Sequence, residues 1–271
     1  MTTFSRRNSA IFAFTLTELL IVVAILVLLA AIVLPALNSA HESSQMSQSM
    51  ANLRQLVIAN VGYASDHGRY SPADDRWNNR RWHGARTSAA APFDPAKGYL
   101  SDYLGQSRRV GICPLFRDMM QGGSSFEKGT GGYGYNATYI GGMPGEKYDA
   151  QGRRVSAPTS HMHRGDTVMF TTSGYASGET IQEYPYCEPP FWDFGEGPTE
   201  WRPSPTVHFR FRGAALVAWC DGRVTAETKS LREVGHNPHG GDAPAQGLGW
   251  FGPDEQNGFW NPGRTAALSS R

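Results

Sequence analysis

One acidic residue stands inside the most apolar stretch of this chain. Residues 14–34, FTLTELLIVVAILVLLAAIVL, contain a single charged side chain, Glu18. A helix of this length is roughly 30 Å long and matches the hydrocarbon core of a bilayer. A carboxylate at mid-bilayer costs about 2.5–3.5 kcal/mol and less near an interface, so such a residue usually has a partner or a function. The chemistry that Glu18 offers is ion pairing with a positive group on an adjacent helix.

A short polar leader precedes this stretch. Residues 1–13 carry Arg6 and Arg7 and no acidic residue. An ordinary cleaved signal peptide has an apolar region of about 7–15 residues followed by a small-x-small site. The apolar run here is longer, and the nearest candidate, 38–40, begins with Asn where a small residue is required. We therefore expect a membrane-spanning helix over 14–34; a plain signal anchor whose acid snorkels to the membrane surface is the alternative.

The junction between leader and apolar stretch carries a recognisable motif. Residues 13–18, AFTLTE, resemble the prepilin processing motif of type IV pilins and type II secretion pseudopilins. In that family a dedicated peptidase cuts before the Phe, the new amino terminus is N-methylated, and a Glu at the fifth mature position pairs with a neighbouring subunit's terminal amine. The resemblance implies cleavage between Ala13 and Phe14 and makes Glu18 the assembly residue. Pro35 is also typical of these proteins, whereas Ala13 replaces their usual Gly.

The helix is expected to continue over 35–66 as an amphipathic segment. Its apolar stripe has helical spacing and consists of Leu53, Leu56, Val57, Asn60, Val61 and Ala64. Pro35 should bend the helix where it leaves the membrane. His67-Gly68 is a typical helix end. The stripe is apolar enough to pack on a sheet.

Residues 67–271 are expected to form one β-rich domain. The segments 110–114 and 167–171 predict strands, and 129–142, which alternates Tyr with small residues, predicts twisted strands. Asp221-Gly222 separates two strand-like runs and predicts a hairpin in which both turn residues have positive φ. The expected fold class is α+β: a long N-terminal transmembrane-plus-amphipathic helix packed on an antiparallel β-sheet, the pilin-like arrangement that the resemblance implies.

The domain also resembles a large pilin-like family of planctomycete-type bacteria. The segments that carry this resemblance are 52–56, 63–66, Cys113-Pro114, 133–136 and 213–227. The C-terminal signature of that family places nine residues between a His and an Asp-Gly pair. Here Asp221-Gly222 matches, but Phe211 stands at the His position and the nearest His is His208. The signature is degenerate, and no role of that His is carried over.

Two tryptophans offer a binding surface. Trp77 and Trp82 stand with four arginines in 74–95, which has no clear periodicity and predicts a long surface loop. Indole and guanidinium groups could stack on sugar rings, together with the Pro- and aromatic-rich loop 184–201. Packing of the loop by Trp against Arg stems is the ordinary alternative.

The remaining residues offer little further chemistry. A balance of 25 Lys and Arg against 24 Asp and Glu gives no field that would recruit nucleic acid. Asp254 and Glu255 could bind Ca²⁺, but two adjacent acids alone supply too few oxygen ligands. We therefore expect no cofactor. We find no convincing GxSxG, HExxH or GxxxxGK motif and expect no enzyme. Export would allow one disulfide among Cys113, Cys187 and Cys220, with three pairings open.

These features lead us to expect a prepilin-like structural subunit, a pseudopilin or minor pilin of a secretion pseudopilus or surface filament. By resemblance, its partners would be a prepilin peptidase, other pilin or pseudopilin subunits and inner-membrane lipid. It would cross the bacterial inner membrane once, with 67–271 periplasmic or extracellular. A membrane-anchored carbohydrate-binding module outside the inner membrane is the alternative.

Overall fold

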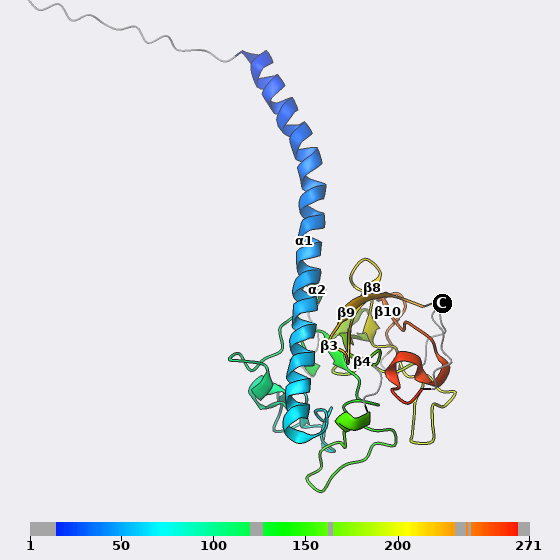
Figure 1. The fold of residues 1–271 in the computed structure, drawn as a ribbon. Coiled ribbons are helices and arrows are strands. Elements are labelled where there is room, and N and C mark those ends of the chain that lie inside the picture. Colours follow the sequence, from blue (N-terminus) through cyan, green and yellow to red (C-terminus); the bar gives the residue numbers. More distant parts are fainter. Residues whose placement is uncertain (1–14, 120–126, 162–164, 231–236, 238–239, 265–271) are drawn as a thin grey trace, which may run out of the picture. The chain divides into compact units, whose positions relative to one another are not determined.

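The computed structural model describes residues 15–119, 127–161, 165–230, 237 and 240–264. The chain divides into two compact units, 1–44 and 45–271. Helix α1 (Leu16–His67) supplies the described part of the first unit and continues into the second (Figure 1). Pro35 lies inside this helix.

In the second unit, α1 has one buried face. Its buried residues are Gln45, Ser49, Leu53, Leu56, Val57, Ala59, Asn60, Tyr63 and Ala64. The predicted stripe is confirmed at every position except Val61, which is exposed. Val61 lies at the margin of the stripe in a helix of 3.6 residues per turn, and Tyr63 borders the stripe on its opposite margin. The helix ends at His67, as predicted, and Gly68 adopts a φ of +69°. The Gly68 N–H donates to the carbonyl of Ala64 at 2.9 Å, a typical closing bond of a helix C-terminus.

A four-stranded antiparallel sheet forms the centre of the second unit (Figure 1). Its strands, in spatial order, are β3 (Tyr133–Tyr135), β4 (Val168–Thr172), β8 (Ala214–Trp219) and β9 (Val224–Thr228). Three two-stranded sheets accompany it: β1 (Arg80–Arg81) with β2 (Gly84–Ala85), β5 (Tyr175–Ser177) with β6 (Thr180–Gln182), and β7 (Val207–His208) with β10 (Leu248–Gly249). The short helices are η1 (Pro95–Lys97), η2 (Ser101–Tyr103), α2 (Pro114–Met119), η4 (Thr159–His161) and η5 (Glu255–Trp260).

Both faces of the sheet are covered. Side chains alternate along β8 because successive residues of a strand point to opposite faces. Leu216 and Ala218 join the cluster that contains the buried stripe of α1. Val217 and Trp219 join a second cluster, which contains three aromatic residues of the C-terminal segment: Trp250, Phe251 and Trp260. The C-terminal segment therefore packs on a face of the sheet.

Two asparagines of α1 form hydrogen bonds with β3, an edge strand of this sheet. Asn52 donates to the Tyr133 hydroxyl at 3.1 Å, and Asn60 donates to the Tyr135 hydroxyl at 2.9 Å. Asn60 also accepts from the Ser71 N–H at 2.9 Å. Buried polar groups require such partners, which explains why an amide stands within an apolar stripe. The expected α+β class, with a long N-terminal helix and antiparallel sheets, is confirmed.

The predicted hairpin is confirmed, but its turn differs. β8 and β9 pair in antiparallel register. The Trp219 N–H donates to the Arg223 carbonyl at 3.0 Å, and the Trp219 carbonyl accepts from the Gly222 N–H at 3.0 Å. Of the two central residues, only Gly222 has positive φ, at +89°. The loop is thus one residue longer than a two-residue turn, and a single glycine in the left-handed region suffices to close it.

Two other sequence-based expectations are wrong. The segment 110–114 is not a strand, since Pro114 begins helix α2, a position where its missing N–H costs nothing. The segment 74–95 is not a surface loop, since it contains the paired strands β1 and β2 and the fully buried Trp82 and His83. We ascribe this second error to charged residues whose partners lie far away in the sequence.

Candidate functional site

The first unit is an apolar helix with no protein packed around it in the described residues. Every side chain from 15 to 44 is exposed. Within the described part of the chain, α1 is the one helix that is long and apolar enough to cross a membrane. A helix that is hydrophobic on all sides requires apolar surroundings, either lipid or neighbouring helices. This surface is the first functional feature of the molecule.

Glu18 closes a capping box at the start of this helix. Its Oε2 accepts hydrogen bonds from the Thr15 N–H at 2.9 Å and the Thr15 hydroxyl at 2.8 Å. In return, the Thr15 hydroxyl oxygen accepts from the Glu18 N–H at 3.2 Å. The first N–H groups of any helix have no intrahelical acceptor, and this reciprocal pair satisfies two of them. The carboxylate thus lies at the N-terminal end of α1, where the backbone dipoles favour negative charge.

This placement bears on the predicted processing site. Ala13 and Phe14 lie outside the described residues, as does the whole leader 1–13, so cleavage between them stays a prediction. Glu18 is held beside Thr15, the second residue of a chain that would begin at Phe14. Sequence reasoning missed the capping box, although Thr-x-x-Glu before an apolar run is its recognisable signal.

The two tryptophans proposed as a sugar-stacking pair lie in different environments. Trp77 is 62% exposed, and its ring packs where a side chain on Gly152 would otherwise lie. Trp82 is 0% exposed, and its indole N–H donates to the Pro185 carbonyl at 2.8 Å. An indole without exposed surface cannot stack on a ligand, so Trp82 is a core residue and the proposed pair is wrong.

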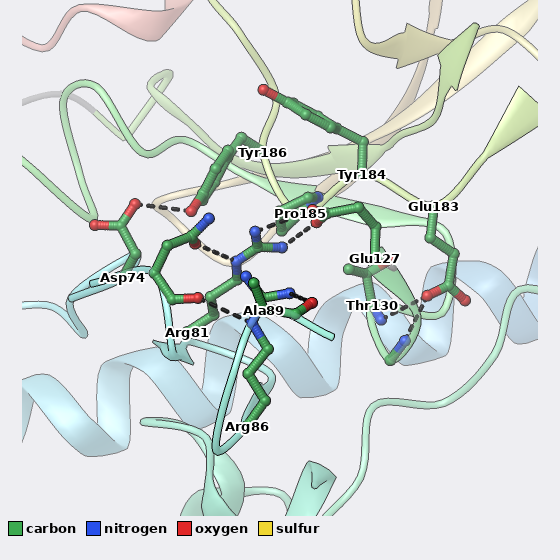
Figure 2. A network of polar contacts seen from close by, with 12 residues as sticks. Asp74, Arg81, Arg86, Ala89, Glu127, Thr130, Glu183, Tyr184, Pro185 and Tyr186 are labelled. Atoms are coloured by element: carbon green, nitrogen blue, oxygen red, sulfur yellow. Dashed lines mark hydrogen bonds and ion pairs between the residues drawn. The ribbon is translucent and has the colours of Figure 1, made fainter. Parts of the chain in front are cut away.

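A network of buried charged groups lies around Trp82. Arg81 forms an ion pair with Glu127 and donates from Nε to Asn78 at 2.7 Å (Figure 2). Glu183 accepts the backbone N–H of Thr130 at 3.1 Å. The pair of Arg81 and Glu127 fastens 74–95 to a segment 46 positions further along the chain. The four arginines of 74–95 were the visible signal, but their spacing does not reveal their partners.

One of the two acids considered for Ca²⁺ has another partner. Asp254 accepts from the Arg202 guanidinium at 2.6 Å, and Glu255 begins η5. Among the residues that the structure describes, no group of three or more His, Cys, Asp or Glu is placed to hold a metal ion.

The cysteines and the histidine near the degenerate signature belong to the core. Cys113, Cys187 and Cys220 are free thiols, so the disulfide that export would allow is not formed. Burial raises the pKa of the Cys187 and Cys220 thiols, which lowers their reactivity. Burial, with the nearby Arg210, lowers the pKa of His208 to about 2. His208 is therefore a neutral residue of the interior.

A long apolar N-terminal helix followed by an antiparallel sheet is a pilin-like arrangement, and one comparison agrees with it. The chain is similar to the type IV major pilin protein PilA of Myxococcus xanthus, with 39% identity over 94 residues. The alignment covers 32% of this chain and 41% of that pilin, so the chain spans less than half of its relative's length. No family model matches the chain, and no solved structure matches it either.

The relative and the helix together support a pilin-like family. They also indicate a membrane-anchored protein that crosses the bilayer once, because the described part of the chain offers one helix of sufficient length and apolarity. The side of the membrane on which 45–271 lies belongs to the proposal that follows.

Proposed function

We propose that this protein is a pilin-like structural subunit, a pseudopilin or minor pilin, which assembles through α1 into a secretion pseudopilus or surface filament. The observation that carries the proposal is the wholly exposed apolar helix of the first unit with Glu18 at its start. Similarity to a type IV major pilin over a third of the chain supports it.

Processing would prepare the helix for assembly. A prepilin peptidase would hydrolyse the peptide bond between Ala13 and Phe14, which leaves a carboxylate on the leader and a free amine on Phe14. The amine would then be N-methylated. Thr15 and the apolar helix that follows would remain as they are in the structure, so the capping box would survive cleavage.

Assembly would bring Glu18 to the amine of a neighbouring subunit. A carboxylate and an ammonium group in an apolar bundle stabilise each other, whereas either alone is costly there. The second unit would be displayed outside the inner membrane, in the periplasm or beyond. We infer a structural and not an enzymatic role. The rival carbohydrate-binding module is not proposed, because it required Trp82 at the surface and Trp82 is buried.

Two substitutions separate the charge of Glu18 from its capping role. Glu18→Gln keeps the capping box, since Gln also serves at that position, but removes the charge. Glu18→Ala removes both. We expect both variants to insert in the membrane and to lose filament incorporation by more than about tenfold, because the neighbouring amine is left unpaired. Incorporation is measured by immunoblotting of sheared or cross-linked filaments.

The control is Glu42→Gln, which removes an exposed carboxylate of the same unit. We expect it to assemble like the wild type. Normal assembly of Glu18→Gln together with failure of Glu18→Ala would contradict the ion pair and assign Glu18 to helix capping alone.

A further inference from the structure

The second unit contains a cleft that the proposed filament role does not use. It has a volume of about 770 Å³ and is lined by residues of three segments, 74–78, 137–154 and 184–194. A volume of this size suits a small organic ligand. The cleft lies entirely within 45–271.

A buried aspartate lies in the wall of this cleft. Asp74 is 6% exposed, and its Oδ2 accepts from the Tyr186 hydroxyl at 2.7 Å (Figure 2) and from Arg154 at 3.1 Å. Its other oxygen, Oδ1, is buried and has no hydrogen-bond partner among the described residues. Such an orphaned buried acceptor is costly, so this wall of the cleft already carries an uncompensated acidic group. Burial is also the largest cause that raises the pKa of Asp74.

A second buried acid lies in the same wall. Glu188 accepts from the Tyr184 hydroxyl at 3.0 Å and forms no ion pair with any described residue. Burial raises its pKa to about 7. The charged and titratable groups around Glu188 are Tyr184, Arg154, Glu146 and Asp74. Glu188 also lines a second, smaller pocket together with Arg202. Arg202 itself is paired with Asp254, so Glu188 lacks a cation of its own.

The charge of the cleft is unbalanced. Five of its lining residues are acids, namely Asp74, Asp75, Glu146, Glu188 and Asp193, and two are bases, namely Arg76 and Arg154. Arg154 is already bound to Asp74 and Glu146. An anionic ligand would be repelled, whereas a cation would meet carboxylates without direct positive partners.

Aromatic rings complete the wall. Trp192 and Phe194 stack with ring centroids 6.4 Å apart and planes 17° apart, and Phe194 is largely exposed. Tyr148 also lines the cleft, and the Arg76 guanidinium lies 6.0 Å from its ring centroid. The face of an aromatic ring attracts a cation, and this contact with Arg76 shows that the wall presents such faces.

We propose that the cleft binds a small organic cation, an aliphatic amine whose ammonium group reaches Glu188 while its methylene groups pack on the aromatic wall. The ammonium group supplies the positive partner that Glu188 lacks. Their alkyl chains suit the rings of Trp192 and Phe194. This activity is separate from filament assembly, so it holds or fails independently of Glu18.

The test is isothermal titration of the full-length protein with spermidine and with tetramethylammonium. The detergent should have a polyoxyethylene head group, since sugar or choline head groups would compete for the cleft. We expect Glu188→Gln to weaken spermidine binding by at least about tenfold above neutral pH. Glu200→Gln, a matched loss of an exposed carboxylate in the same loop, should leave binding unchanged.

The pH dependence gives a second readout. A cation prefers the ionised form of Glu188, so the wild-type affinity should rise between about pH 6 and about pH 8, with a proton released on binding. Glu188→Gln should flatten this rise. Phe194→Ala, at a side chain too exposed to be needed for folding, should weaken binding several-fold at every pH.

Three outcomes would overturn the proposal. The first is no binding of either cation at millimolar concentration. The second is equal binding by wild type and Glu188→Gln above neutral pH, which would place the cation elsewhere. The third is binding of maltose that survives Glu188→Gln and is lost in Phe194→Ala, which would make the cleft a sugar site.

Discussion

The two parts of α1 differ in a way that their sequences do not suggest at first sight. Residues 16–44 include the most apolar stretch of the chain, yet all their side chains are exposed. Residues 45–67 are more polar, yet they bury a complete stripe that includes Gln45, Ser49 and Asn60. Burial within this chain therefore follows packing partners and not apolarity alone. The first part is built for partners outside the chain, and the second for the sheet.

Matched leucine substitutions give the largest effect expected from this comparison. Leu53 is 0% exposed and Leu28 is 67% exposed. Leu53→Ala should lower the free energy of unfolding of the second unit by about 2–5 kcal/mol, because it leaves a cavity in a packed core. Leu28→Ala should leave it unchanged. All seven tryptophans lie beyond residue 76, so their fluorescence in denaturant reports on the second unit alone. Equal effects of the two substitutions would break the comparison.

The pH dependence of stability should also reside in the second unit. Burial raises the pKa of Glu188 from its ordinary 4.5 to about 7, so the folded state holds this proton more tightly than the unfolded state. The contribution of Glu188 to the free energy of unfolding is fully present below about pH 4.5 and is lost as the pH rises to about 7. Relative to wild type, Glu188→Gln should therefore gain roughly 3 kcal/mol across this window.

Denaturant titrations of both proteins at several pH values measure this difference. Glu200→Gln serves as the exposed control and should follow the wild type throughout. A difference between wild type and Glu188→Gln that does not change with pH would contradict the raised pKa.

The smallest effect concerns a polar residue in the stripe. Asn60→Ala removes the donor to Tyr135 and the acceptor for Ser71, and we expect a loss of about 1–3 kcal/mol. Asn38→Ala, in the exposed part of the same helix, should leave the free energy of unfolding of the second unit unchanged. Thermal denaturation followed by tryptophan fluorescence checks both. A stable Asn60→Ala would show that the amide is dispensable for docking the helix.

The elements that local sequence determines were predicted well. The stripe at Leu53, Leu56 and Asn60 follows helical spacing, Gly68 ends α1, and Gly222 closes the hairpin of β8 and β9. Each of these depends on residues a few positions apart. The capping box of Thr15 and Glu18 was equally local and could have been predicted from its spacing.

The parts that were missed depend on distant partners. Arg81 and Glu127 are buried only because they form an ion pair, and they lie 46 positions apart in the sequence. No residue near either of them in the sequence indicates this partner. The same holds for Arg154 and Asp74 in the cleft. A charged, aperiodic segment without a visible partner is ordinarily a surface loop, and 74–95 was predicted as one for that reason. Aromatic residues of the C-terminal segment gave no indication of which face of the sheet they cover.

The central claim is that α1 becomes an assembly element after removal of the leader. The most direct test is mass spectrometry of the protein purified from assembled filaments or from the membrane of its host. We predict a mature chain that begins at Phe14 and carries one additional methyl group on its amine. An intact N-terminus, or cleavage at any position other than that before Phe14, would contradict the account and leave α1 a plain membrane anchor.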